Sequence, residues 1–253
     1  MAKFKAIESP LKMSRAYFKK VTSFFSNVAS VETTVTSPFM TRHKGPLGLF
    51  VISADTGLCG VYNYQVMRAT ERFIEANKGQ DIKLYVYGRK GAGHFRKRGI
   101  PVEHIFPGMH GRMKADFHQS VLDLLTADFL SHKISEFHVA HTVFINPMKS
   151  NAIVEKFLHV DRPELKDTNF ILEFTHEGIL SELMPLYLSS KLRLMMLESL
   201  TAEHASRMVA MKSSKDNAKE LMGDLILLRN KVRQAAITKE VIEIISSVEA
   251  LKG

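Results

Sequence analysis

The sequence predicts an α/β fold in which a mainly parallel sheet is inserted between the two helices of a long antiparallel coiled coil. Three observations support this prediction: a helical repeat near the start, alternating strand-like and helix-like stretches in the middle, and an uninterrupted helix at the end. From Leu186 onward the chain has no proline, and its only glycine before the last residue is Gly223. Such a helix would extend roughly 100 Å at about 1.5 Å per residue. This exceeds the usual helix of a globular domain, so we interpret it as a spine for partner chains.

The first segment, residues 1–46, is predicted to be a coiled-coil helix followed by a linker. After Pro10, apolar residues recur in alternating steps of four and three, which is typical of a helix packed against another helix. These residues are Tyr17, Val21, Phe24, Val28 and Val31. The pairs Ser37-Pro38 and Gly45-Pro46 then interrupt the helix and lead into a loop.

The second segment, residues 47–175, is predicted to be the α/β domain. Continuous apolar runs indicate strands buried on both faces, and periodic stretches between them indicate covering helices. The expected strands are residues 47–52, 83–87, 136–144 and 153–158, and the expected helices are residues 63–76 and 117–131. Between them, Gly88 to Gly93 is predicted to form a glycine-rich turn, followed by a short helix.

The third segment, residues 176–253, is predicted to be one long helix. It should begin near Leu180, because Pro185 then falls in the first turns, where proline is tolerated. Farther along, a second seam with steps of three and four is typical of a left-handed coiled coil. Its residues are Ala218, Leu221, Leu225, Leu228, Val232 and Ala235.

Composition indicates a soluble chain of the reducing cytoplasm. Hydrophobic residues make up 45% and charged residues 24% of the sequence, which is ordinary for a globular protein. No apolar run approaches the ~20 residues needed to span a bilayer. The start, Met1 to Lys5, lacks the apolar core of a secretory signal, and the single cysteine, Cys59, excludes an internal disulfide framework.

The formal net charge of +9 is concentrated at the start, where residues 1–46 carry eight Lys or Arg and two Glu. A basic arm of this kind fits nucleic acid, an acidic membrane surface or an acidic protein partner. A solvated helix face explains it equally well. Neither interleaved aromatic residues nor zinc-ligand spacing favours nucleic acid.

The turn Gly57-Leu-Cys-Gly60 is a candidate ligand site, because backbone amides between a strand and a helix can hold a phosphate. It lacks the spacing of a Walker loop. We therefore favour a tight turn in which glycine is needed for its backbone conformation. Cys59 is interpreted as a small packed residue rather than a nucleophile, since no His and Asn/Asp pair can be assigned to it.

Two further groups of residues are weaker candidates. The Gly88–Gly93 turn contains Arg89 and Lys90 and is followed by residues 96–98, all basic, which we interpret as a solvated basic loop rather than an anion site. The histidines do not show metal-ligand spacing. His104, His110 and His118 lack a carboxylate motif, and His138 and His141 should lie on opposite faces of a strand. We expect no metal and no cofactor.

Two motifs in the long helix are more specific. The first is Ser199-Leu-Thr-Ala-Glu-His-Ala-Ser-Arg-Met-Val-Ala-Met-Lys212, continuing to Asp216-Asn217, and the second is Asn230-Lys-Val-Arg-Gln-Ala-Ala-Ile-Thr-Lys-Glu-Val-Ile-Glu-Ile244. Both closely resemble the carboxyl-terminal helix of the gamma subunit of F-type ATP synthase. Ser53-Ala-Asp-Thr-Gly-Leu-Cys-Gly60, with Asn63, resembles the first strand-turn-helix of that family. The resemblance covers roughly residues 14–253.

The resemblance implies a non-catalytic central-stalk rotor inside a hexamer of alpha and beta subunits, which couples ion-driven rotation to ATP synthesis or hydrolysis at beta-subunit sites. It also implies contact with the epsilon subunit and the membrane c-ring, a peripheral place on the cytoplasmic face of a bacterial inner membrane, and neither nucleic-acid binding nor insertion into the membrane. By motif, the residues expected to contact beta subunits are Arg207, Arg233, Gln234, Thr238, Glu240 and Glu243.

The sequence departs from the family at its start. Residues 1–13 do not match the longer basic helix with which family members open, and residues 14–17 resemble a later part of that helix. A shortened or divergent amino-terminal helix is therefore expected. Two other functions stay open at this point: a divergent gamma-like paralogue without a rotary role, and a basic α/β scaffold protein. A small-molecule enzyme at the Gly57–Gly60 turn has the least support.

Overall fold

The computed structural model describes residues 2–31, 37–106, 108, 116–162 and 179–251. By its internal contacts the chain consists of two units, Met1–Val209 and Ala210–Gly253. The division expected from sequence, at residues 46 and 175, does not coincide with this boundary. Residue 46 falls inside the first unit, residue 175 lies outside the described residues, and the boundary falls within a helix.

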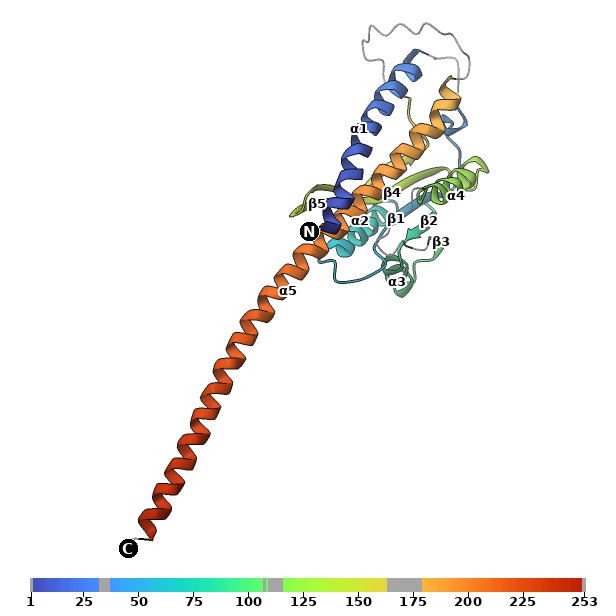
Figure 1. Ribbon diagram of the computed structural model, residues 1–253. Helices are drawn as coiled ribbons and strands as arrows, with labels where there is room; N and C mark the ends of the chain where they lie inside the picture. Colours follow the sequence, from blue (N-terminus) through green and yellow to red (C-terminus); the bar gives the residue numbers. More distant parts are fainter. Residues whose placement is uncertain (1, 32–36, 107, 109–115, 163–178, 252–253) are drawn as a thin grey trace. The chain divides into compact units, whose positions relative to one another are not determined.

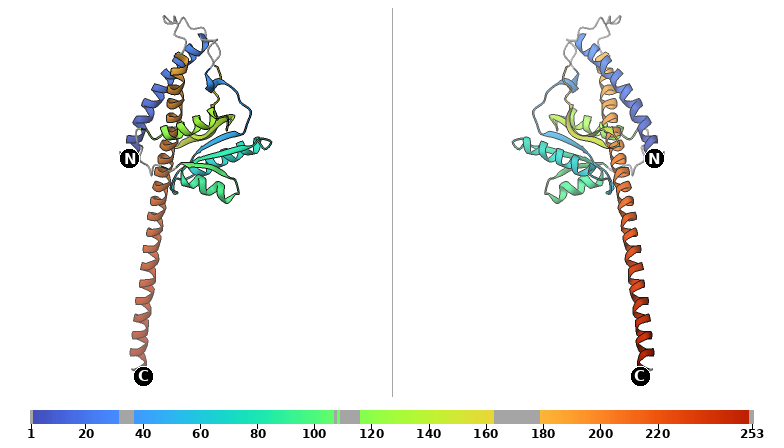
Figure 2. Two further views of the ribbon diagram at one scale, coloured as in Figure 1. Left: turned by 90° about the vertical axis from the view of Figure 1, so that its right-hand side faces the viewer. Right: turned by 90° about the vertical axis from the view of Figure 1, so that its left-hand side faces the viewer.

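The first unit is built on a five-stranded sheet with strand order β3-β2-β1-β4-β5 (Figures 1 and 2). Three of its neighbouring pairs, β1–β2, β1–β4 and β2–β3, are parallel, and β4–β5 is an antiparallel hairpin. The strands are β1 Leu47–Ile52, β2 Ile82–Tyr87, β3 Val102–Phe106, β4 Glu136–Asn146 and β5 Lys149–Leu158. A mostly parallel sheet is thus confirmed. The strand expected at residues 153–158 belongs to β5, which runs against the others.

Helices cover both faces of the sheet. The helices are α1 Ala2–Val31, α2 Tyr62–Ala76, α3 Arg89–Lys97, α4 Gln119–Leu130 and α5 Ile179–Ala250, and a short 3-10 helix, η1, spans Pro38–Met40. Alternate residues of β1 point to opposite faces. Phe50 and Ile52 pack in one core with α4, α1 and the first turns of α5. Leu49 and Val51 pack in a second core with α2 and α3.

The central strand β1 is buried along its whole length, as its apolar sequence predicts. Gly48 is required there by close packing, since a Cβ atom at this position would lie 2.3 Å from two ring carbons of Phe137 on β4. Phe137 is completely buried. The only glycine of the strand therefore makes room for a phenylalanine ring of the neighbouring strand β4.

α1 runs antiparallel to the first part of α5 inside the first unit. The Phe25 ring stacks on Tyr187 with ring centroids 4.4 Å apart. Ten residues earlier in α1, the guanidinium of Arg15 donates two hydrogen bonds, 2.9 and 2.8 Å long, to one carboxylate oxygen of Glu198. Arg15 also donates to the carbonyl oxygen of Phe144. This side chain thus joins α1, α5 and β4.

The predicted apolar seam of α1 is only partly correct. Val21 and Val28 are buried, and the side chain of Val31 lies outside the described part. Tyr17 and Phe24, however, are 49% and 42% exposed. The buried face is turned to one side of the predicted stripe because it contacts the sheet as well as α5. The buried residues are Leu11, Ser14, Val21, Phe25, Val28 and Ala29.

Two elements differ from the sequence-based expectation. Residues 89–93, predicted as a turn, form the first half of α3, and β3 was not predicted.

α5 begins at Ile179 with Pro185 inside its second turn, close to the expected start. α1 contains Pro10 and continues back to Ala2. None of the described helices combines the length and the apolar character needed to cross a membrane.

Candidate functional site

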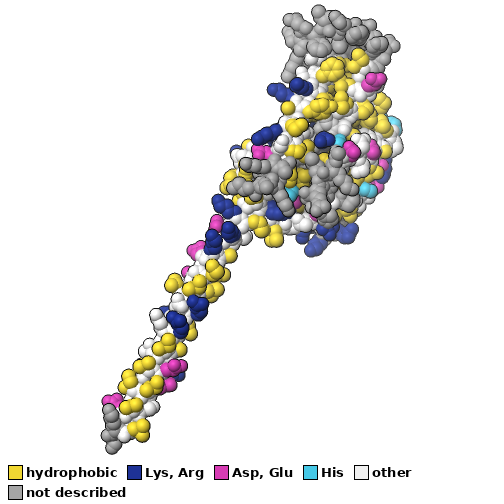
Figure 3. Space-filling view, in the orientation of Figure 1, with side chains coloured by type: hydrophobic (Ala, Val, Ile, Leu, Met, Phe, Trp, Pro, Cys, Tyr) yellow, Lys and Arg dark blue, Asp and Glu magenta, His cyan; other side chains and the backbone are white. Residues whose placement is uncertain are grey.

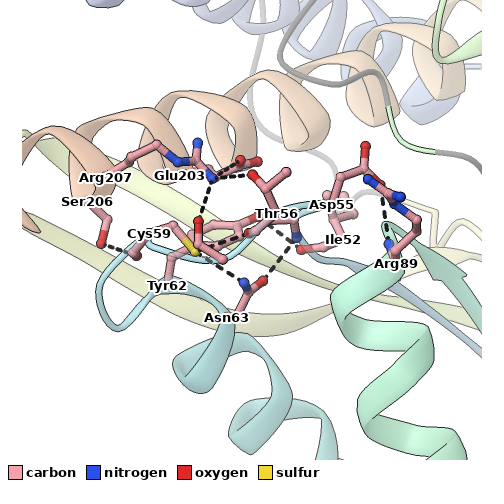
Figure 4. A network of polar contacts seen from close by, with 12 residues as sticks. Ile52, Asp55, Thr56, Cys59, Tyr62, Asn63, Arg89, Glu203, Ser206 and Arg207 are labelled. Carbon is pink, nitrogen blue, oxygen red and sulfur yellow. Dashed lines mark hydrogen bonds and ion pairs between the residues drawn. The ribbon is translucent and has the colours of Figure 1, made fainter. Parts of the chain in front are cut away.

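The carboxyl end of β1 leads into a turn, residues 53–61, which takes part in a network of polar contacts (Figure 4). The backbone of this turn is left-handed at Leu58, with φ 58°, and at Gly60, with φ 54°. Asn63, in the first turn of α2, accepts a 3.0 Å hydrogen bond from the Ala54 amide and donates one of 3.1 Å to the Cys59 sulfur. The turn is therefore held from the helix that follows it.

α5 holds the same turn from the other side. Ser206 donates a 2.6 Å hydrogen bond to the carbonyl oxygen of Cys59. The Arg207 guanidinium donates to the Thr56 hydroxyl at 2.9 Å and to the Gly57 carbonyl oxygen at 3.5 Å. The same guanidinium nitrogen lies 2.8 Å from a carboxylate oxygen of Glu203, one turn earlier on the helix. Figure 4 shows these α5 side chains directed toward the turn.

Burial sets the electrostatics of this contact. It raises the pKa of the Glu203 carboxyl above its ordinary value, and the Arg207 guanidinium partly opposes that effect. Burial likewise raises the pKa of the Tyr62 hydroxyl, which donates a 3.0 Å hydrogen bond to the Ile52 carbonyl oxygen. It also raises the pKa of the Cys59 thiol. A thiol with a raised pKa is a poor nucleophile, which fits a packing role for Cys59.

The described residues enclose a small cavity at this end of the sheet. This cavity, with room for about 20 Å³ of solvent, lies between the turn, β2 and α5, which is enough for one water molecule. Open α/β sheets commonly bind ligands at such an edge, but here α5 covers it. The arrangement favours the tight-turn interpretation of Gly57–Gly60. The cavity is lined by Ile52, Ser53, Tyr62, Tyr87, Phe117, Met196, Leu200 and Glu203.

Two glycines after β2, Gly88 and Gly91, allow close packing against Ser53. Gly88 has φ 92°, and a Cβ atom there would lie 2.3 Å from the Ser53 carbonyl oxygen. The Gly91 amide donates a 3.0 Å hydrogen bond to the Ser53 hydroxyl. Arg89 lies near Asp55, with 3.9 Å between side-chain nitrogen and oxygen. Arg98 pairs with Glu71.

The histidines considered in the sequence lie on different elements. His104 is exposed on β3, His118 precedes α4, and His110 lies outside the described residues. On β4, His138 faces Glu136 at 3.2 Å and His141 faces Glu155 at 3.0 Å. In the described ranges, no three His, Cys, Asp or Glu side chains are grouped in a way that could hold a metal ion.

The predicted partner-contact residues fall in both units. Arg207 belongs to the first unit, where its own chain engages it as described above. The other five are exposed residues of α5 in the second unit. Thr238 donates a 2.8 Å hydrogen bond to the Gln234 carbonyl oxygen, and a carboxylate oxygen of Glu243 lies 3.8 Å from Lys239. The members of this exposed group are Arg233, Gln234, Thr238, Glu240 and Glu243.

Sequence reasoning missed two residues of the site, Glu203 and Ser206. The spacing of Glu203 and Arg207, four residues apart on a helix, was a signal for their ion pair. No local pattern could have found the contact of Arg207 with Thr56, since the two residues are 151 positions apart in the sequence.

Comparison with known proteins shows that the chain is similar to one family over nearly its whole length. Residues 1–251 match the model of a family described as ATP synthase. The chain is 31% identical to the ATP synthase gamma chain of Chloroherpeton thalassium, over 99% of this chain and 90% of the relative. It is 32% identical to the ATP synthase gamma chain of a Geobacter species, over 100% and 90%.

Two solved structures resemble the fold. One is a chain of the Euglena gracilis mitochondrial ATP synthase, with a TM-score of 0.64, 14% identity, and coverage of 99% of this chain and 95% of that chain. The other is a chain of the central stalk and c-ring of the Tetrahymena thermophila mitochondrial ATP synthase, with a TM-score of 0.55, 18% identity, and coverage of 85% and 98%. At these identities the likeness concerns the fold alone.

Proposed function

The chain belongs to the ATP synthase gamma chain family, and from this membership we propose that it is the central-stalk rotor subunit of an F-type ATP synthase. The observation that carries the proposal is the family match, which extends over residues 1–251 and so includes both the sheet domain and α5. In this role the chain has no catalytic site. It transmits ion-driven rotation to the beta subunits, where ATP is made or hydrolysed.

The surface of α5 supports a surrounding partner. Every side chain described from Met211 to Leu251 is exposed, except that of Asn230, which is half-buried. The seam residue Leu221 is 59% exposed and Val232 is 61% exposed. Apolar side chains at coiled-coil spacing gain stability only when another chain covers them. Together with the antiparallel contacts of α1, this pattern supports a long antiparallel coiled coil. In this proposal other subunits enclose the exposed residues 211–251 of α5.

We assign the contacts with beta subunits to the six motif residues named above. In this proposal Arg233, Gln234, Thr238, Glu240 and Glu243 form exchangeable polar contacts, which suit a surface whose neighbours change as it turns. Arg207 has a side chain only 24% exposed and already bound to Glu203. Its role would require that one of its own-chain hydrogen bonds be exchanged for a bond to the partner.

The remaining assignments follow from the same role. The partners are the alpha and beta subunits, the epsilon subunit and the membrane c-ring. The chain acts at the cytoplasmic face of a bacterial inner membrane as a peripheral subunit. Functionally it divides into an amino-terminal coiled-coil helix (1–46), an α/β domain (47–175) and a long helix (176–253). The α/β domain is the part proposed to face epsilon and the c-ring.

Co-purification tests the role. Tagged chain expressed in its native cell should recover alpha and beta subunits in fixed proportion. Recovery of neither would contradict the rotor role and favour a gamma-like paralogue or scaffold. A salt series then separates those two, because binding to nucleic acid through phosphate contacts weakens steeply as salt rises.

The contact residues are tested in the assembled complex. Arg233→Ala with Gln234→Ala should lower the rate at which the complex hydrolyses ATP, while leaving the isolated chain equally stable. Lys239→Ala provides the control, since Lys239 is exposed on the same stretch of α5 and, six and five residues beyond Arg233 and Gln234, lies on another side of the helix from both. Equal effects of both changes would refute the assignment of these residues.

A further inference from the structure

The second unit has an apolar seam on α5 at coiled-coil spacing. With Met211 at position a of a heptad, positions a and d recur in steps of three and four as far as Ala235, over about three and a half heptads. Seven of these eight positions are apolar, and the eighth is Ser214. A repeat of this length is typical of a coiled coil. The members of this α5 seam are Met211, Ser214, Ala218, Leu221, Leu225, Leu228, Val232 and Ala235.

No described residue of the second unit covers the α5 seam. All of its side chains are exposed, and those of Leu221, Leu225 and Leu228 are 59%, 56% and 57% exposed. Figure 3 shows hydrophobic side chains along this stretch of the helix. Burial of apolar surface is the main favourable term in protein association. A chain whose α5 is not enclosed by other subunits is therefore stabilised by a partner that covers the seam.

The seam ends after Ala235. Continuing the same heptads places two charged residues, Lys239 and Glu249, and the polar Ser246 at positions a or d. Apolar residues recur instead at positions c and f, on the opposite side of the helix. A coiled coil along the seam is thus confined to residues 211–235, a length of about 37 Å. The residues of the opposite stripe are Ile237, Val241, Ile244 and Val248.

The charged residues beside the seam make it complementary to itself in the parallel orientation. Two parallel helices in register bring each position g next to position e of the following heptad in the other helix. In this chain that arrangement pairs Asp224 with Arg229 of a second copy, twice by symmetry. The other g–e pairs along the seam, 210 with 215, 217 with 222 and 231 with 236, bring no like charges together.

The same residues oppose the antiparallel orientation. If residues 211–235 of two copies overlap fully in opposite directions, position e faces e and position g faces g. Lys215 then faces Arg229 of the second copy, and Asp224 faces Asp224. Like charges at these flanking positions destabilise a pairing. The flanking charges therefore favour the parallel over the antiparallel pairing of two copies.

We propose that the α5 seam is covered by the α5 seam of a second copy of this chain, in a parallel coiled coil, until other subunits enclose α5. In this pair Leu221 packs on Leu221, and Val232 on Val232, of the other copy. Val at position a with Leu at position d is a combination that favours two strands. The proposal goes beyond the rotor role and rests on it only for the later replacement of the second copy.

Sedimentation equilibrium of the purified full chain at micromolar concentration tests the proposal, and the chain should form dimers. Asp224→Arg replaces two attractive pairs by two repulsive ones and should raise the dissociation constant at least about tenfold. Adding Arg229→Asp restores the complementarity and should return that constant to within about threefold of its original value. Asp216→Arg is the matched control, because Asp216 is exposed at position f, away from the seam, and should leave the dimer unchanged.

A disulfide reports the orientation and register. In the parallel pair, Leu228→Cys places the two thiols in one layer, so oxidised glutathione should join two copies through position 228. Leu227→Cys is the control, because Leu227 is 69% exposed but lies at position c, outside the seam. Mass spectrometry identifies the joined cysteines, since Cys59 is also present.

Four results would overturn the dimer: a monomeric chain, larger assemblies only, equal cross-linking from positions 227 and 228, or a charge exchange that fails to restore the dimer. Circular dichroism shows whether the variants keep the helix content of the original chain. Recovery of alpha and beta subunits tests the rotor role separately. If these subunits are recovered while the free chain is a monomer, the dimer alone is refuted.

Discussion

Removal of Arg15 tests whether the contact between α1 and α5 depends on a buried charge. Arg15 donates two hydrogen bonds to Glu198, whose side chain is only 10% exposed. Arg15→Met keeps much of the side-chain length but leaves the carboxylate without its cation. Removing one partner of a buried pair costs about 3–5 kcal/mol. Because the Arg15 side chain is 39% exposed and partly screened by water, we expect about 2–3 kcal/mol near neutral pH.

The cost should depend on pH. Burial raises the pKa of Glu198 above its ordinary value, and Arg15 opposes this, so the substitution raises that pKa further. A carboxyl whose folded pKa is raised stabilises the fold below its unfolded pKa, about 4.3, and loses this contribution as pH rises through its folded pKa. Below its raised folded pKa the carboxyl of the variant is protonated. The cost should then fall to about 1 kcal/mol, that of neutral hydrogen bonds.

Urea unfolding at about pH 5 and about pH 8, followed by tyrosine fluorescence, measures both values. The chain has six tyrosines and no tryptophan, and all six lie between residues 17 and 187, so the signal reports the first unit alone. Adding Glu198→Gln to Arg15→Met should remove most of the loss at the higher pH. Lys12→Met, at an exposed pair, should cost less than about 0.5 kcal/mol. Equal losses at both pH values, or no rescue by Glu198→Gln, would refute the reasoning.

Three further predictions concern packing. Gly88→Ala should destabilise the first unit by at least about 3 kcal/mol, and Gly99→Ala by about 1 kcal/mol. Both glycines have positive φ, but only a Cβ atom at Gly88 would meet the Ser53 carbonyl. Urea unfolding compares the two variants, and equal costs would contradict the close approach. Cys59, 2% exposed, should react with a thiol reagent at least about a hundredfold more slowly in native than in urea-unfolded chain, measured by absorbance; fast native labelling would show that the turn opens. Deleting residues 210–253 should shift the thermal midpoint of tyrosine fluorescence by less than about 2 °C, since the first unit has its own core; a large drop would show that it depends on the second unit.

The parts of the fold that could be predicted are those in which local pattern and tertiary packing agree. β1 was predicted because six consecutive buried residues produce a continuous apolar run. β3 was missed because Glu103, His104 and Ile105 are exposed, which leaves an edge strand without a strong apolar signal. The first half of α3 was predicted as a turn because of its glycines, with a short helix only after Gly93. A tertiary contact with Ser53, which a sequence window does not contain, explains why Gly91 occurs in this helix.

The candidate site was predictable only in outline. The Gly57–Gly60 turn was located correctly, and the tight-turn interpretation gained support from the structure. What the sequence could not reveal is that α5 supplies Ser206 and Arg207 to hold this turn, since contact over about 150 positions depends on the whole fold. Similarly, Tyr17 and Phe24 were assigned to the buried seam because a heptad repeat does not state which side of a helix also meets a sheet.

The way α5 meets the two cores determines how the first unit can move. Residues from Leu180 to Met196 pack in the core shared with α4, and Leu197, Ala202 and Ala205 pack in the core shared with α2 and α3. Successive turns of one helix are thus anchored in both cores of the sheet domain. Twisting this stretch about its axis would disturb close packing in both cores at once. Both cores therefore oppose rotation of the helix relative to the sheet. The sheet domain and residues 180–205 should therefore turn together as a single body.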